Sequence, residues 1–228
     1  MTLSEYARQM FKTLIYLFAS MVPALAAADD RVKFDNDAVR VLKITDVPHK
    51  KSTLHKHELN RVMIYLTAGD LDVTAENGKV EHQHWKAEQV AWSPAGGLHT
   101  SENVGEKPLV IVEVELKRKS PAAPGRDPKL DPVAIDPKHN NLIYENAQVR
   151  VFRSWREPGM SELMHEHTGA GRVVVLLTDI FAKVRMGNGE ASELKDKAGE
   201  VHWTGGGSTH AGTNAGAARF DMILVEVK

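Results

Sequence analysis

The chain has 228 residues, 29 Lys+Arg against 30 Asp+Glu, a formal net charge of -1 and no cysteine. This length can bury the core of one large domain or two small ones. The balanced charge argues against nucleic acid or an anionic membrane as a partner, since both attract a strong basic excess. The absence of cysteine excludes disulfides, thiolate metal sites and a cysteine nucleophile, whereas the 11 histidines remain candidate ligands.

The N-terminal segment is typical of a secretory signal peptide. Lys12 precedes a short apolar run and a tract of small residues that ends at Ala28. This pattern predicts cleavage after Ala26 or Ala28, and Met10 is an alternative start. We therefore expect residues 1–28 to be removed and the mature protein to be periplasmic or secreted, with no membrane attachment. The alternatives are an N-terminal membrane anchor or a buried helix.

The rest of the chain contains an internal repeat. Residues 34–41 match residues 144–151, and residues 61–67 match residues 172–178, with one inserted residue between the two alignments. The later Asn-Gly, Trp, His and Asn residues of the two halves also match in the second of these alignments. One register held over that distance predicts a duplicated domain.

The repeat sets the expected domain boundaries. The first domain is expected over 29–118 and the second over 141–228, joined by a Pro-rich linker over 119–140. Five prolines fall between Pro121 and Pro137, which argues against a strand or a helix interior. The linker is expected to be extended along the surface.

Each half is expected to consist of short strands. Residues 61–67 and 172–178 are apolar, β-branched runs bounded by turn residues. Asn-Gly at 77–78 and at 188–189 favours two-residue type I′ hairpin turns. No long segment after the signal has helical periodicity, so an all-β sandwich or barrel is predicted.

Three histidines in each half have the spacing of metal ligands. In an HxH pair the two side chains point to the same face of a strand. A third histidine from a distant strand would complete a triad that imidazole-binding metals accept. The two sets are His55, His57 and His99 in the first half, and His165, His167 and His210 in the second.

These motifs resemble those of the cupin superfamily, which has HxH followed by Glu, and PxGxxH followed three residues later by Asn. Residues 94–103 resemble the second motif in full, and residues 205–214 resemble it with Gly205 in place of proline. The resemblance covers nearly all of the mature chain. It implies a bicupin, with two tandem jelly-roll (double-stranded β-helix) barrels. It also implies a divalent transition metal (Fe, Mn, Zn, Cu or Ni) at the histidines.

Arg61 and Arg172 stand where the resemblance places the metal-binding glutamate. Arginine stays protonated and cannot ligate a metal. One hypothesis is that both arginines are catalytic residues that orient a carboxylate or similar oxyanion beside the metal. The other is a buried ion pair, for which Glu115 and Glu226 are the candidate partners.

Other matched residues are expected to be structural. Trp92 and Trp203 are predicted to pack in the barrel core, and Asn103 and Asn214 to fix turns.

The function expected from these features is that of an exported metal-binding bicupin. It would be a dioxygenase-like oxidoreductase or a lyase acting on a small anionic organic molecule. The alternative is a non-catalytic small-molecule or metal-binding cupin with degenerate sites. A homodimer is compatible with exposed barrel edges.

Overall fold

The structure is a computed structural model that describes residues 30–118 and 125–228. The predicted signal peptide and residues 119–124 of the predicted linker lie outside the described residues. Within the described ranges, no helix combines the length and the apolar character needed to cross a bilayer.

The described part of the first half forms two sheets. Their strand orders are β1-β2-β9-β4-β7 and β3-β8-β5-β6. The strands are β1 (Val32–Asp35), β2 (Val39–Asp46), β3 (His55–His57), β4 (Arg61–Tyr65), β5 (Gly69–Ala75), β6 (Val80–Trp85), β7 (Gln89–Ser93), β8 (Gly96–Asn103) and β9 (Leu109–Leu116).

The described part of the second half repeats the same topology, with strand orders β10-β11-β18-β13-β16 and β12-β17-β14-β15. The strands are β10 (Asn140–Glu145), β11 (Val149–Arg156), β12 (His165–His167), β13 (Gly171–Leu176), β14 (Ile180–Met186), β15 (Ala191–Asp196), β16 (Val201–Gly205), β17 (Ser208–Asn214) and β18 (Phe220–Val227).

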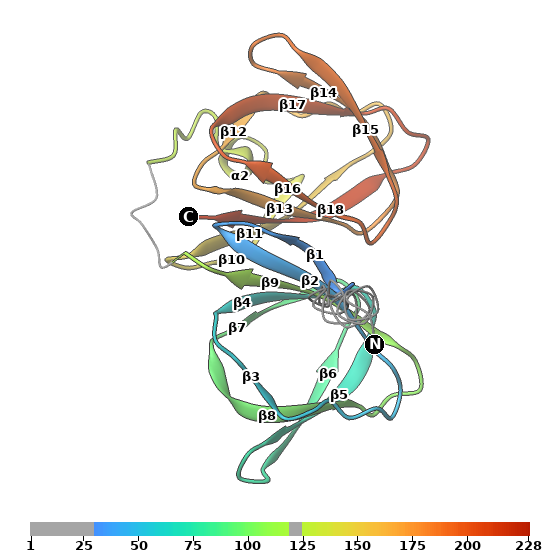
Figure 1. Ribbon diagram of the computed structural model, residues 1–228. Helices are drawn as coiled ribbons and strands as arrows, with labels where there is room; N and C mark the ends of the chain where they lie inside the picture. Colours follow the sequence, from blue (N-terminus) through green and yellow to red (C-terminus); the bar gives the residue numbers. More distant parts are fainter. Residues whose placement is uncertain (1–29, 119–124) are drawn as a thin grey trace, which may run out of the picture. The chain divides into compact units, whose positions relative to one another are not determined.

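In each half the two antiparallel sheets close into a jelly-roll barrel (Figure 1). The predicted all-β fold with two tandem cupin barrels is confirmed.

Alternation along the strands separates the inside of each barrel from the packed core outside it. On β18, Met222 and Leu224 point into the barrel cavity, whereas Ile223 and Val225 are fully buried in the core. Strand β9 follows the same rule, with Glu113 inside the barrel and Val114 in the core. The period of two therefore decides which side chains can reach a bound ligand.

One hydrophobic core cluster contains side chains from both halves, among them Val41, Val112, Val151 and Val225. The runs 61–67 and 172–178, which were predicted as strands, contribute Val62, Ile64, Val173 and Val175 to this cluster. Trp92 and Trp203, which were predicted to pack in the barrel core, are partly buried against this cluster. Trp92 stacks on Tyr144 and also borders the cavity of the first barrel.

The Asn-Gly segments form hairpins, but with a different turn from the one predicted. The amide of Gly78 bonds to the carbonyl of Ala75, and the amide of Ala75 to the carbonyl of Lys79. Among these residues only Gly78 has a positive φ, of 81°. A type I′ turn needs positive φ at both central residues, so that prediction is wrong. A three-residue loop with glycine in the left-handed position replaces it.

The predicted extended linker contains a short helix, α2 (Pro132–Ile135). The side chain of Asp131 accepts hydrogen bonds from the amides of Val133 and Ala134 and so caps the helix. Proline is tolerated in the first turn because its missing N–H would have no partner there. The prediction of an extended conformation is therefore wrong for this segment.

Candidate metal centres

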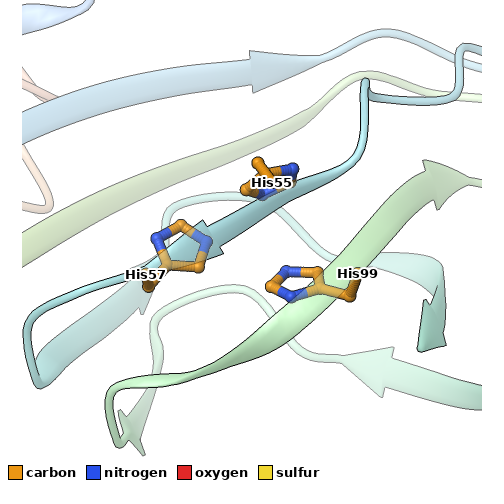
Figure 2. Close-up of side chains that lie close together, drawn as sticks. All are labelled: His55, His57 and His99. Carbon is orange, nitrogen blue, oxygen red and sulfur yellow. The ribbon is translucent and has the colours of Figure 1, made fainter. Parts of the chain in front are cut away.

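The first histidine triad comes from two neighbouring strands. His55 and His57 lie on β3, and His99 lies on β8 directly opposite His55. Figure 2 shows the three rings directed toward one another. Ring centroids are 4.6–5.3 Å apart, and one nitrogen from each ring lies within 4.8 Å of the others. The structure thus brings together all three residues that the sequence predicted as ligands.

The second triad repeats this arrangement at greater depth. His165 on β12 faces His210 on β17, and both are buried, as is His167. The Nε2 atoms of His165 and His167 are 3.1 Å apart. Two nitrogens that each lie ~2.0–2.1 Å from one ion are separated by at most ~4 Å, so this spacing fits a shared metal ion.

Backbone carbonyls orient three of the six imidazoles. The Nδ1 atoms of His55, His99 and His165 lie 2.8, 3.0 and 2.9 Å from the carbonyl oxygen two residues earlier in the chain. A carbonyl can only accept, so Nδ1 must carry the proton. Nε2 then keeps its lone pair for a metal, as in ligating histidines.

A carboxylate takes the place of the carbonyl at His167. Nδ1 of His167 donates to Glu226 at 2.6 Å. Glu226 in turn lies 3.6 Å from Arg150, which makes a bidentate pair with Asp131 at the start of α2. Burial raises the pKa of Glu226 to about 7, opposed by Arg150.

The pKa values of three imidazoles favour the neutral form that metals require. Burial, followed by the charge of Arg61, lowers the pKa of His57 to about 3. Burial lowers the pKa of His210 to about 3 and that of His167 well below its usual value. These rings therefore remain unprotonated ligands at neutral pH.

Arg61 is neutralised by a residue that sequence reasoning missed. Its guanidinium lies 3.1 Å from Glu113 and donates to the hydroxyl of Ser93 at 2.9 Å. The predicted partner, Glu115, is the cross-strand neighbour of Arg61 but makes no ion pair with it among the described residues. The ion-pair hypothesis therefore holds in the first barrel, with a different acid. Glu113 lies two residues before Glu115 on β9 and therefore points to the same face of the strand, and this spacing could have identified it as a second candidate.

Arg172 has no such partner. It is only 7% exposed, and within the described ranges it makes no ion pair; Glu226, the predicted partner, bonds to His167 instead. Nη2 of Arg172 lies 3.4 Å from Nε2 of His210, and Nη1 is buried with no hydrogen-bond partner among the described residues. Burial lowers the pKa of Arg172 to about 10, so the guanidinium is still charged at neutral pH.

Several solved structures share this fold. AerE from Microcystis aeruginosa is 14% identical over 86% of this chain and 90% of its own, with a TM-score of 0.62. An oxalate decarboxylase variant from Bacillus subtilis is 11% identical over 84% and 69%, with a TM-score of 0.60. A cupin 2 conserved barrel domain protein from Leptotrichia buccalis is 14% identical over 86% of each chain, with a TM-score of 0.51. The chain has the fold of a bicupin. No family model and no curated protein matches it.

The two barrels contain cavities of different character. The first, of about 260 Å³, is lined by polar groups such as Asp46, Gln83 and Glu113. The second, of about 380 Å³, is lined mostly by apolar side chains, with Arg172 among its few charged groups. Each triad borders its own cavity, so a ligand in the cavity can reach the histidines.

Histidine donors fit a borderline transition metal, and both triads have room for further ligands on the cavity side. The assignment of Arg61 and Arg172 to the position of a cupin glutamate stays a prediction. So does their assignment as catalytic residues.

Proposed function

We propose that this bicupin is an exported metal-dependent enzyme, a dioxygenase-like oxidoreductase or a lyase, that acts on a small anionic organic molecule. The observation that carries the proposal is the second triad. Three buried imidazoles converge beside the guanidinium of Arg172 on the wall of the cavity in the second barrel. Perturbed ionisable groups gathered in such a cavity are typical of a functional site.

The metal would be Fe, Mn, Zn, Cu or Ni, held by His55, His57 and His99 or by the second triad. The oxalate decarboxylase of similar fold has Mn(II) centres. When bound, such an ion supplies Lewis-acid chemistry and, if redox-active, electron transfer at its open coordination positions.

The residues of the chain have three roles in this proposal. The imidazoles hold the ion, with Nδ1 protons fixed by carbonyls or by Glu226. Arg172 binds and orients the anionic group of the substrate. The apolar wall excludes water and so strengthens the attraction between guanidinium and anion.

The second candidate function is a non-catalytic cupin that binds a metal or a small molecule. The first barrel favours it, because Arg61 is already neutralised by Glu113 and offers no free charge to a substrate.

Turnover measurements distinguish the two functions. The purified protein is loaded with each candidate metal and incubated with aromatic acids, keto acids and aliphatic acids. Oxygen uptake or release of carbon dioxide that requires metal, and that is lost in His165→Ala/His167→Ala, is the expected result. Stoichiometric metal binding without turnover of any acid would support the non-catalytic function instead.

Export is tested separately. Expression of the full chain in a Gram-negative host, followed by N-terminal sequencing of the periplasmic protein, should show a mature chain that starts after Ala26 or Ala28. An uncleaved protein retained in the cytoplasm would refute export without touching the metal sites.

A further inference from the structure

We propose that the second barrel alone takes the organic ligand, and that this ligand is a monocarboxylate with an apolar body. The inference rests on the proposed function for the metal at the triad, and it adds the substrate class and the barrel. The first barrel would hold a metal ion without an organic acid.

The charge in the second barrel requires an external partner. A buried guanidinium without a counter-ion is costly, and Nη1 of Arg172 has no acceptor within the described part of the chain. Among the described residues, Nε2 of His210 is the one hydrogen-bond partner of its Nη2. An ion at the triad would take the lone pair of that nitrogen, and both ends of the guanidinium would then need a new acceptor. A bidentate carboxylate fits this need.

Equivalent positions in the two barrels explain why the first would not bind the same ligand. Glu113 lies opposite Met63 on the neighbouring strand, and Leu224 lies opposite Val174 in the same way. Glu113 neutralises Arg61, whereas Leu224 cannot neutralise Arg172.

Asp46 and Arg156 are a second pair of equivalent positions, and they add to the difference in charge between the two barrels. Asp46 ends β2 and borders the first cavity, whereas Arg156 is buried and ends β11. The first cavity is therefore bordered by two carboxyl groups and one guanidinium that is already paired, so it offers an organic anion no unpaired positive charge. In the second, the acid that borders the cavity is Glu162, which pairs with Arg156 at 3.5 Å and accepts from the amide of Gly212.

The second cavity also selects an apolar body. At the position where Gln83 faces the first cavity, Leu194 faces the second. Phe152, Ile180 and Phe220 continue the apolar wall. With about 380 Å³ available, the cavity admits a ring or a branched chain beside the carboxylate.

Calorimetric titration of the Zn(II)-loaded full chain with benzoate tests the proposal, because zinc has no redox chemistry. One benzoate should bind per chain. Benzamide, which lacks the charge, and acetate, which lacks the apolar body, should each bind at least tenfold more weakly. Two equivalent benzoate sites per chain, or equal affinity for benzamide, would overturn the proposal.

Variants then locate the site. Arg172→Gln should abolish benzoate binding, and Leu224→Glu should weaken it at least tenfold by supplying an internal carboxylate. Leu224→Gln is the control, because it adds a polar group of the same size as Glu but without the charge. The Leu224→Gln protein should bind benzoate at least fivefold more tightly than the Leu224→Glu protein. Benzoate affinity unchanged in a folded Arg172→Gln protein contradicts the inference, and thermal unfolding verifies folding. If no variant folds, the ligand series on the unaltered chain still decides.

The same titration without metal separates this inference from the proposed function. Failure to retain zinc or any other of the candidate metals would refute the metal-dependent function, while single-site benzoate binding would still support the inference.

Discussion

The contact between His167 and Glu226 predicts that the second metal site depends on a residue that does not itself ligate. A carboxylate behind a ligating imidazole fixes the ring and raises its basicity. Replacing Glu226 with Gln should weaken metal binding at the second site about 10- to 100-fold, measured by competition with a chelating dye. In the described part of the chain no hydrogen bond joins His57 to Glu115, the equivalent acid. Glu115→Gln is therefore the control and should change affinity at the first site less. Equal losses would contradict the role of Glu226.

The Arg61–Glu113 pair predicts a stability effect in the first barrel. Both side chains are 8% exposed, so removing one charge leaves the other buried without compensation. Glu113→Gln should lower the free energy of unfolding by ~3–5 kcal/mol in denaturant titration. The double variant Arg61→Met/Glu113→Leu should recover most of that loss, because apolar residues of similar volume replace the pair. A double variant as unstable as Glu113→Gln would show that the loss is not electrostatic.

At the residue scale, the sequence predicted which histidines meet. The HxH pairs follow from strand geometry, whereas the third histidine of each set followed from the internal repeat and the resemblance to the second cupin motif. It did not predict the partners of the arginines. Both Glu113 and Glu115 face inward on β9, and the choice between them depends on side-chain reach across the barrel. Only the three-dimensional structure distinguishes Arg61, which is paired, from Arg172, which makes no ion pair with any described residue.

At the element scale, the connection between β12 and β13 is shaped by glycine. Gly169 has φ +89°, and a Cβ there would lie 2.3 Å from the carbonyl oxygen of Val227. Gly78, in the hairpin between β5 and β6, has a similar φ of +81°, but a Cβ added there would contact no atom of the other described residues within 4 Å. Gly78→Ala should therefore cost only the backbone term of about 1–2 kcal/mol. Gly169→Ala should cost clearly more by denaturant unfolding, because the backbone must shift as well. Equal costs would contradict the steric argument.

The errors at this scale have local causes. An Asn-Gly pair signals a hairpin, but loop length is set by strand register, and the register here leaves three residues in the loop. The helix α2 was not predicted because the five prolines of the linker argue against a helix interior. Asp131 followed by Pro132 was a cap signal within that segment.

At the scale of the whole molecule, the repeat predicted two barrels but not a common core. One buried cluster contains side chains from both halves, including Val62, Val114 and Val173. We predict that the described halves unfold together, in a single calorimetric transition whose van't Hoff and calorimetric enthalpies agree. Two separate transitions would show that each barrel is stable alone. Shared burial of this kind depends on the outer faces of the sheets, which a repeat alignment does not reveal.

Metal content measured per barrel tests the central claim most directly. Elemental analysis of the metal-loaded, desalted protein should find two transition-metal ions per chain. His55→Ala/His57→Ala and His165→Ala/His167→Ala should each reduce this to one while the protein stays folded. A folded protein that retains no metal, or a metal content unchanged by both double substitutions, would contradict the assignment of the two histidine triads as metal centres.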